Sequence, residues 1–308
     1  MFLNYLIKRI SGALLVLFGV STLVFLLIHL IPGDPVEVML GESARAADRE
    51  ALRQALGLDL PLLQQWWQYL SGIFHFDLGD SLYTKRAVTD LLLERIPATA
   101  MLSIASMVVA IVIALPLGML AAVYKNSIWD RLAMMTAMFG VSIPNFVMGP
   151  LLIIIFALWL GWFPVSGHQG MLSLVLPALT LGTALAAILS RMIRASMLQV
   201  LEEDYIRAAR ARGIKESRVL LLHGFRNAAL PVITVFGMQF GALLTGAVIT
   251  ETIFSWPGVG QLMIESIQKR DYPIVQACVL LISLIYVFVN LLTDLLYTML
   301  DPRVKLES

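Results

Sequence analysis

Residues 202–231 have the sequence EEDYIRAARARGIKESRVLLLHGFRNAALP, and this stretch decides how the rest of the chain is organised. Six of its residues are Arg or Lys, whereas long apolar runs lie on both sides of it. Burying an unpaired charge in an apolar medium is very costly, so such a segment must lie in water or against a partner. The stretch therefore predicts a polar insert between two membrane spans.

The composition agrees with a membrane protein. Hydrophobic residues make up 59% of the chain, charged residues 14%, and the mean hydropathy is +0.83. Soluble domains carry roughly 45–50% apolar and about 25% charged residues. The net charge of +1 gives no reason to expect a nucleic-acid partner. Cys278 is the single cysteine, which excludes a disulfide within the chain and predicts a small packed hydrophobe.

Six apolar runs are long enough to cross a bilayer, which needs roughly 20 residues of helix. Each must be helical, because backbone polar groups cannot stay unpaired in hydrocarbon. The first run is too long for a signal peptide and lacks a cleavage site, so it is expected to remain as an anchor. We therefore predict an all-α integral membrane protein with spans at about 10–31, 99–123, 132–160, 172–195, 230–252 and 274–299.

The distribution of Lys and Arg predicts an orientation with both termini in the cytoplasm. Of the 22 basic residues, 14 then lie on the cytoplasmic side, as the positive-inside rule requires. These are Lys8, Arg9, Lys125, Arg131, the eight from Arg191 to Arg226, Arg303 and Lys305. The expected divisions are 1–31 (N-terminus and first span), 32–98 (external helical segment), 99–299 (five-span core), its cytoplasmic insert 196–229, and the tail 300–308.

The external segment is predicted to hold two helices. It opens with Pro-Gly-Asp-Pro at 32–35, which stops a helix. One helix is expected over Ser43–Leu56, and a second begins after Pro61 with apolar and aromatic residues on one face: Leu62, Leu63, Trp66, Tyr69, Leu70 and Ile73. The segment is interpreted either as a lid on the bilayer or as a docking surface for an external partner.

Two features inside the spans bear on packing. Pro116, Pro144, Pro150 and Pro177 interrupt helices, as in transporters and in many other bundles. Gly237, Gly241 and Thr245 recur at four-residue intervals, a pattern that lets another helix approach closely. That helix could belong to this chain or to a second subunit.

The chain carries no motif that predicts an enzyme. No G-x-x-x-x-G-K-[ST] loop for ATP is present. His29, His75, His168 and His223 are scattered, without a ligand spacing for a metal. No serine or cysteine stands in a recognisable nucleophile motif.

The basic insert is predicted to form two short helices, over Asp204–Arg212 and Lys215–Arg226, that are separated at Gly213, a residue suited to the left-handed end of a helix. The second helix is expected to end before Pro231. Tyr205, Ala208 and Arg212 lie at helical spacing, and small residues let such a helix enter a groove. A solvated loop or an anionic-lipid site would explain the arginines. Neither explains the small residues and the glycine.

The segments DYIRAARARG and RNAALP resemble the EAA-type coupling loop of ABC importer permeases, in particular the peptide, opine and nickel group. The likeness extends over the whole chain, through IKR at 7–9, HLIPGDP at 29–35, LGLDLPL at 56–62, TETIFSWPGVG at 250–260, RDYP at 270–273 and DPR at 301–303. It implies the type I ABC importer permease fold. Arg207 departs from the general motif, which has Glu there.

The resemblance implies a permease for small peptides such as dipeptides, oligopeptides or glutathione in the bacterial inner membrane. It also implies partners: a second related permease, two ATP-binding subunits that hold ATP and Mg²⁺, and an external solute-binding protein. No cofactor or metal is expected in this chain. A nickel-chelate permease is the alternative within the family, and an ATPase-independent secondary transporter or channel is the alternative outside it.

Two sets of residues are the candidate sites that this resemblance implies. The ATPase-coupling set is Tyr205, Arg207, Ala208, Ala209, Arg210, Gly213, Arg226, Asn227 and Pro231. The external set, expected at the outer gate or at the contact with the binding protein, is Glu251, Phe254, Trp256, Pro257, Gly258, Asp271 and Tyr272.

Overall fold

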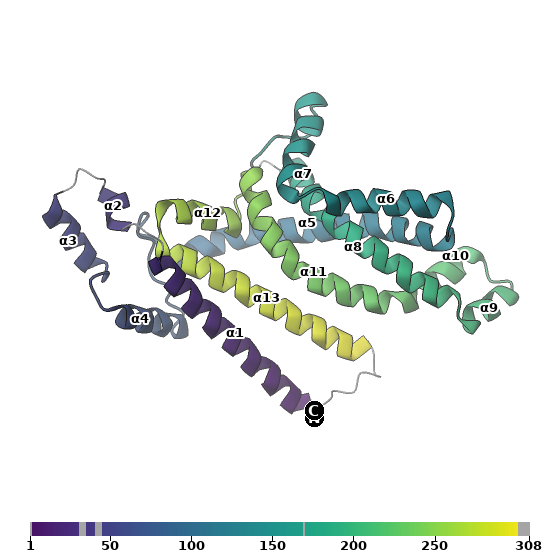
Figure 1. Ribbon diagram of the computed structural model, residues 1–308, viewed down its shortest axis with the longest axis horizontal. Helices are drawn as coiled ribbons and strands as arrows, with labels where there is room; N and C mark the ends of the chain where they lie inside the picture. The colour runs from purple at the N-terminus through teal and green to yellow at the C-terminus, as the bar shows by residue number, and fades with distance from the viewer. Residues whose placement is uncertain (1, 31–34, 41–44, 169, 301–308) are drawn as a thin grey trace. The chain divides into compact units, whose positions relative to one another are not determined.

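The computed structural model describes residues 2–30, 35–40, 45–168 and 170–300, and in these ranges the regular elements are helices (Figure 1). An isolated bridge between Asp80 and Ala87 is the exception. The Pro-Gly-Asp turn at 32–34, the predicted helix start at Ser43 and the tail motif at 301–303 lie outside the described residues.

In the part of the chain that the structure describes, four helical stretches are long and apolar enough to cross a membrane by themselves. They lie in α1 (Phe2–Leu30), α5 (Val88–Val123), the short η2 (Met171–Leu174) continued by α8 (Val175–Leu201), and α13 (Tyr272–Leu300). Two bent helix pairs also pass this test when each pair is taken together. Counting each pair as one span gives the six that the sequence predicts.

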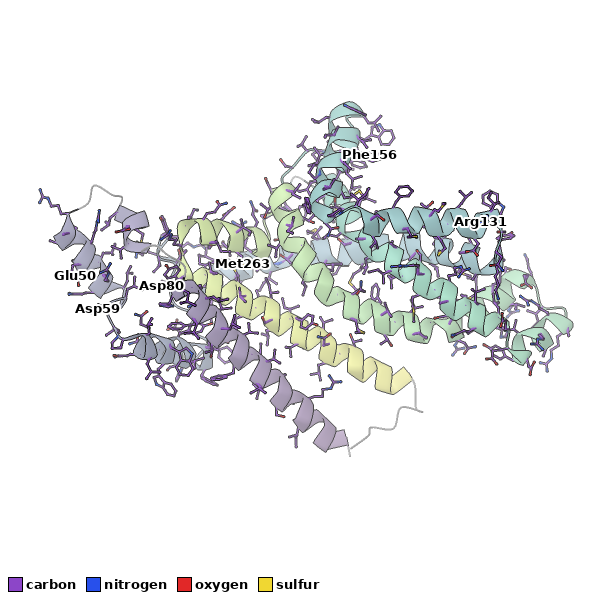
Figure 2. The ribbon with its side chains drawn as sticks, in the orientation of Figure 1. Glu50, Asp59, Asp80, Arg131, Phe156 and Met263 are labelled. Carbon is purple, nitrogen blue, oxygen red and sulfur yellow. The ribbon has the colours of Figure 1, made fainter. Side chains whose placement is uncertain are left out.

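The third predicted span, 132–160, is broken in its middle. It consists of α6 (Ile128–Ser142), α7 (Asn145–Leu152) and the π-helix η1 (Ile153–Trp159), and the chain bends by 103° between α6 and α7. Ile143 is extended at the bend, because the ring of Pro144 disfavours the helical region for the residue before it. Phe156 on η1 is labelled in Figure 2. Its ring lies beside those of Trp162 and Phe163, with centroids 5.8 and 6.5 Å away.

The fifth predicted span corresponds to α11 (Arg226–Ile253). The expectation that a helix of the insert ends before Pro231 is wrong, because α11 continues through this proline. The axis bends by 54° there, between Glu216–Ala229 and Pro231–Gly241. A proline inside a helix removes one backbone hydrogen bond and kinks the axis.

The chain divides into two compact units that alternate along the sequence. Unit 1 contains Ala100–Trp256 and the chain from Phe288 onward, and unit 2 contains Phe2–Thr99 with Pro257–Val287. The helices α5 and α13 each contribute to both units. This division differs from the linear one that the sequence suggests.

In unit 1, α8 is the central helix and packs against α5, α6, α7 and α11. Its buried side chains include Leu185, Leu189, Ile193 and Met197, which form one core with residues of α5 and α11. Gly140 lets α6 approach α8 so closely that an added Cβ would lie 2.9 Å from the carbonyl carbon of Thr183, and closer still to its oxygen. Such backbone proximity requires a residue without a side chain.

The small-residue stripe on α11 is used within this chain at one position. A Cβ on Gly237 would lie 2.9 Å from the Cβ of Thr293, so α11 approaches α13 there. The side chain of Thr245 lies outside the described residues.

Unit 2 contains the two predicted external helices, which are α3 (Ala46–Ala55) and α4 (Leu62–Phe74). It also contains α2 (Pro35–Leu40) and α12 (Val259–Lys269), which the sequence analysis does not predict. Its core joins distant segments through Val88, Leu92, Val259, Leu262, Ile274, Ala277 and Cys278. Cys278 is buried in this core, which confirms its role as a packed hydrophobe.

The packing of α4 differs in part from its predicted apolar face. Trp66 donates a hydrogen bond to Thr22 on α1 over 3.3 Å, and Tyr69 stacks on Phe25. Leu62 and Leu63 are exposed instead, because they lie at the first turn of α4, before the residues that contact α1.

Candidate functional site

The basic insert forms a small helical motif between α8 and α11. The helix α9 (Asp204–Ala211) follows α8 after Glu202 and Glu203, and then α10 (Glu216–Arg218) and the π-helix η3 (Val219–Phe225) lead directly into α11 (Figure 1). The predicted second helix over 215–226 is therefore α10 and η3, continuous with the span that follows.

Local backbone chemistry sets both ends of α9. Glu203 is extended, with φ −70° and ψ 147°, so the helix begins after it. Gly213 has φ +72°, and its N–H donates to the carbonyl of Arg210 over 2.9 Å. The predicted left-handed helix stop at Gly213 is thus confirmed, since this conformation strongly favours glycine.

A hydrophobic cluster fixes α9 to its surroundings. Ile206 and Ala209 on α9 and Val219 on η3 are buried together against the partly buried Val200, Leu201 and Ile214. Ala209 therefore faces the core of the insert, and its small side chain allows α9 to pack closely here. It does not belong to the surface that α9 presents outward.

The outward surface of α9 combines an aromatic residue, small residues and arginines. Tyr205 is 42% exposed, and Arg207, Ala208, Ala211 and Arg212 are also exposed. Arg207 contacts Asp204 over 3.1 Å and donates to the backbone carbonyl of Glu202 over 3.0 Å. This exposed face, named the α9 face below, is basic and has little side-chain bulk at its alanines.

Polar bonds connect α9 to the elements that follow it. Arg210 pairs with Glu216 at 2.8 Å, and this hydrogen bond raises the pKa of the Arg210 guanidinium. Asn227 on α11 donates to the Tyr205 hydroxyl over 3.0 Å and to the His223 carbonyl over 2.9 Å. The structure thus brings together Tyr205 and Asn227, which belong to the two halves of the predicted motif.

Two other predicted coupling residues do not join this network. Arg226 and Pro231 are exposed on α11, and within the described residues no hydrogen bond links the Arg226 side chain to α9. Pro231 instead marks the bend of α11.

Ion pairs that the sequence does not predict connect the insert to the turn after α5 and connect α8 to the first turn of α6. Lys125 contacts Glu202 over 2.9 Å, and this hydrogen bond holds the pKa of the Glu202 carboxyl below its ordinary value. Arg194 makes two hydrogen bonds of 2.7 Å to the carboxylate of Asp130, which also accepts from the backbone N–H of Asn126. The sequence places these charges at predicted cytoplasmic ends of spans, which is the one signal that could have indicated the pairs. Because 64 or more residues separate the two partners of each pair, sequence patterns do not show which charges meet.

Three of the predicted external residues lie in unit 1, and their side chains are buried. They are Glu251, Phe254 and Trp256. The loop before η2 folds over them: Gly167 donates to the Phe254 carbonyl over 2.9 Å, and the His168 ring lies 4.5 Å from that of Trp256. In this structure their side chains do not form an outer contact surface, and a gating role stays a prediction.

The other four external residues lie in unit 2. Asp271 is buried and accepts from the Ser81 hydroxyl over 2.6 Å and from the Leu82 N–H over 3.1 Å. Gly258 caps α12, Pro257 precedes it, and Tyr272 begins α13. Asp271 thus anchors the loop around 81–82, and contact with a binding protein remains a prediction for this set.

No group of three His, Cys, Asp or Glu residues within the described ranges could hold a metal ion. The arrangement supports docking and transmission of movement, because the exposed α9 face is joined by packing and polar bonds to α8 and α11.

Two family models match the chain. Residues 114–306 match the binding-protein-dependent transport system inner membrane component, and residues 2–103 match the N-terminal membrane component of such systems. The first match includes α8, the insert and α11.

Full-length relatives also match. Glutathione transport system permease proteins GsiC from Escherichia coli and from Pectobacterium atrosepticum are each 46% identical over 303 residues, covering 98% of this chain and 99% of theirs.

Solved structures support the fold at lower identity. The MetNI methionine ABC transporter in an inward-facing conformation matches with a TM-score of 0.59 and 18% identity, over 69% of this chain and 97% of that one. An amino acid ABC transporter matches with a TM-score of 0.51 and 17% identity, over 70% and 95%.

Proposed function

The chain belongs to the inner membrane components of binding-protein-dependent transport systems, and from this membership we propose that it carries glutathione or a related small peptide across the membrane. It is a multi-pass permease subunit of an ABC importer in the bacterial inner membrane. The observation that carries the proposed substrate is 46% identity to glutathione permeases along the whole chain.

The α9 face is proposed to dock into a groove of an ATP-binding subunit. Ala208 and Ala211 leave room for close approach, while Arg207 and Arg212 can pair with acidic groups at the rim of the groove. When ATP binding closes the two ATP-binding subunits, α9 moves with them. Because the buried Ile206 cluster and the Asn227–Tyr205 bond join α9 to its neighbours, the displacement reaches α8 and α11.

The proposed complex contains a second related permease, two ATP-binding subunits and an external solute-binding protein. ATP and Mg²⁺ would be held by the ATP-binding subunits, and this chain would contribute no catalytic group. A solute that binds one conformation of the permease pair better than the other shifts the population toward that state. The nickel-chelate and ATPase-independent alternatives are favoured neither by the family nor by the relatives.

The direct test is uptake by the assembled importer in proteoliposomes. Wild-type complex with its binding protein should accumulate radiolabelled glutathione when ATP is supplied to the ATP-binding subunits. Ala208→Glu should abolish uptake, because it places a charged, larger side chain on the α9 face without disturbing the buried cluster. Uptake and ATP hydrolysis are measured on the same preparations.

A matched control is Ala47→Glu, the same change at an exposed position of α3. It should leave uptake close to the wild-type rate. Wild-type complexes that accumulate neither glutathione nor small peptides would refute the proposed substrate. Full coupling of uptake to ATP hydrolysis in an assembled Ala208→Glu complex would refute the proposed role of the α9 face.

A further inference from the structure

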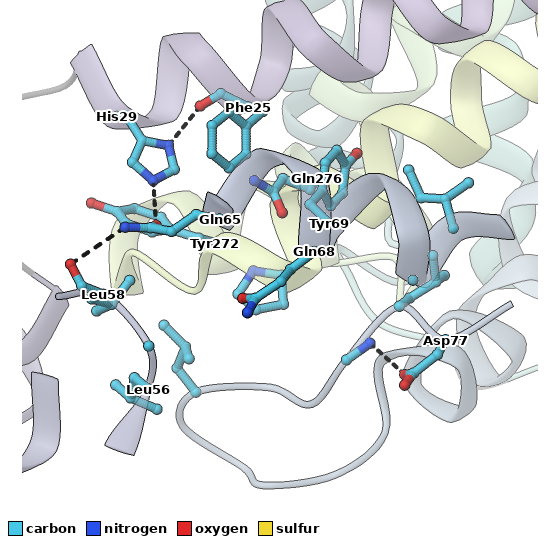
Figure 3. A pocket seen from close by; sticks show the side chains of 17 residues that line it. Phe25, His29, Leu56, Leu58, Gln65, Gln68, Tyr69, Asp77, Tyr272 and Gln276 are labelled. Carbon is cyan, nitrogen blue, oxygen red and sulfur yellow. Dashed lines mark hydrogen bonds between the residues drawn. The ribbon is translucent and has the colours of Figure 1, made fainter. Parts of the chain in front are cut away.

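Unit 2 contains a cavity of about 330 Å³ with several polar lining groups, named the polar cavity below, and Tyr272 of the predicted external set is part of its lining (Figure 3). Its walls come from the end of α1, the link before α4, the inner face of α4, the loop after α4, and the first turns of α13. In the orientation that the Lys and Arg distribution predicts, this is the external end of the unit. The volume falls within the range of small-molecule sites, about 300–1,000 Å³.

One wall is held rigid by hydrogen bonds within the protein. The Nδ1 of His29 lies 2.7 Å from the Phe25 carbonyl oxygen, and its Nε2 lies 3.1 Å from Oε1 of Gln65. The amide of Gln65 donates to the carbonyl of Leu60 over 2.8 Å (Figure 3 shows the neighbouring bond to Leu58). These groups shape the cavity, and their hydrogen-bonding capacity is largely used by the protein.

Two other carboxamides that line the cavity have no such partners. Gln276 on α13 is only 8% exposed, and its side chain makes no hydrogen bond within the described residues. Gln68 on α4 is exposed at the rim and likewise makes none there. The Gln276 carboxamide lines the cavity and can therefore pair with a bound group.

The exposed carboxylate of Asp77 also lines the cavity. One oxygen of Asp77 accepts from the backbone N–H of Gly79 over 2.9 Å, which leaves the other oxygen available. Among the described residues, the lining contains no Lys or Arg. The charge pattern therefore suits a ligand with an ammonium group rather than one with only anionic groups.

A second cavity of unit 2 differs in its lining. It has a volume of about 530 Å³, and Ser21 and Thr89 are its polar lining residues among leucines, phenylalanines and other apolar side chains.

We propose that the polar cavity is a binding site for a peptide-like solute, in which Gln68 and Gln276 pair with its amide groups and Asp77 pairs with its α-ammonium group. A carboxamide offers both donors and an acceptor, as a peptide bond does. The proposal rests on the proposed function, since it names where the transported peptide would first contact this subunit. Fixed walls on α1 and α4 reduce the ordering that binding requires.

The test is retention of radiolabelled glutathione by the purified importer complex in nanodiscs, without its binding protein. Gln276→Leu and Gln68→Leu should each weaken retention about fivefold, the effect of losing roughly one neutral hydrogen bond. Gln64→Leu makes the same change at an exposed position of α4 outside the cavity, and it should bind like the wild type. Because Gln68 lies at the rim, its variant reports on the site even if Gln276→Leu fails to assemble.

A second comparison isolates the ammonium group. Asp77→Asn can still accept from Gly79, so the loop should keep its shape. It should weaken retention of glutathione but leave retention of N-acetylglutathione unchanged. Equal losses for both compounds would overturn the assigned role of Asp77.

The outcomes separate this site from the proposed function. No retention by the wild type at millimolar glutathione, or equal retention by Gln276→Leu and Gln64→Leu, would overturn the site. Retention that depends on Gln276 in a complex unable to import glutathione would support the site and refute the proposed substrate. If the variants changed only the concentration of binding protein needed for uptake, the cavity would be a docking pocket for the binding protein. That result would also overturn the proposal.

Discussion

Gly213 carries the main backbone constraint of the insert. Its φ of +72° lies in the left-handed region, yet a Cβ at this position would meet nothing within 4 Å. The cost of a substitution is therefore conformational rather than steric. For ordinary L-residues that cost is about 1–2 kcal/mol, and asparagine tolerates the conformation better than β-branched residues.

We expect Gly213→Val to reduce coupled uptake strongly and Gly213→Asn to retain most of it. The measurement is glutathione imported per ATP hydrolysed in proteoliposomes, with complex assembly checked by size-exclusion chromatography. Equal activity of the two variants would mean that the turn after α9 does not set the orientation of the α9 face.

For single residues, the sequence predicts conformations that depend on neighbouring residues. It does not predict contacts that depend on residues far away in the chain. The turn at Gly213 follows from local backbone preference. That Ala209 faces inward while Ala208 faces outward depends on Val219, which closes the cluster from η3. The Asp130–Arg194 pair is likewise invisible to local patterns, because it requires that α6 and α8 lie side by side.

Among the elements, α8 depends on close backbone contact with its neighbours. At the contact with α6, any side chain on Gly140 would collide with the backbone of Thr183, which cannot move without shifting α8. Overpacking of this kind typically costs about 1–3 kcal/mol. The close contact of α6 and α8 is thus sensitive to a single methyl group.

We predict that Gly140→Ala lowers the thermal stability of the purified permease complex. Gly12→Ala on α1 is the matched control, because nothing lies within 4 Å of its added Cβ. Alanine is the better helix former, so Gly12→Ala should be neutral or slightly stabilising. Fluorescence-monitored melting compares the two variants, and similar melting temperatures would contradict the close packing of α6 on α8.

The elements themselves were largely predictable, since long apolar runs must be helices in a membrane. The external helices α3 and α4 also follow from composition and from the position of Pro61. Pro144 predicts an interruption, but the 103° bend depends on how α7 packs against α8 and α11. The continuation of α11 through Pro231 is a case in which surrounding structure overrides a local helix breaker.

For the whole molecule, the orientation predicted from Lys and Arg can be measured because Cys278 is the single cysteine. In a Cys278→Ala background, a membrane-impermeant maleimide should label Gln64→Cys in intact spheroplasts. It should label Arg212→Cys only in inside-out vesicles. Binding of the ATP-binding subunits should then protect Arg212→Cys, which lies on the α9 face.

Labelling of both cysteines from the same side would contradict the orientation.

The division into two units was not predictable in the same way. Hydropathy orders the spans along the chain, whereas unit 2 is completed by contacts between Val88 or Leu92 and residues more than 160 positions later, such as Val259 and Ile274.

This alternation of the units has a consequence for synthesis. Residues 2–99 leave the ribosome 158 positions before residue 257, the first of the segment that completes their core. At the usual pace of translation, about 5–20 residues per second, that delay is roughly 8 to 30 seconds. During this time the newly made first span and external helices lack the segment that closes their hydrophobic core, so the N-terminal part of the permease matures only when residues 257–287 have been inserted.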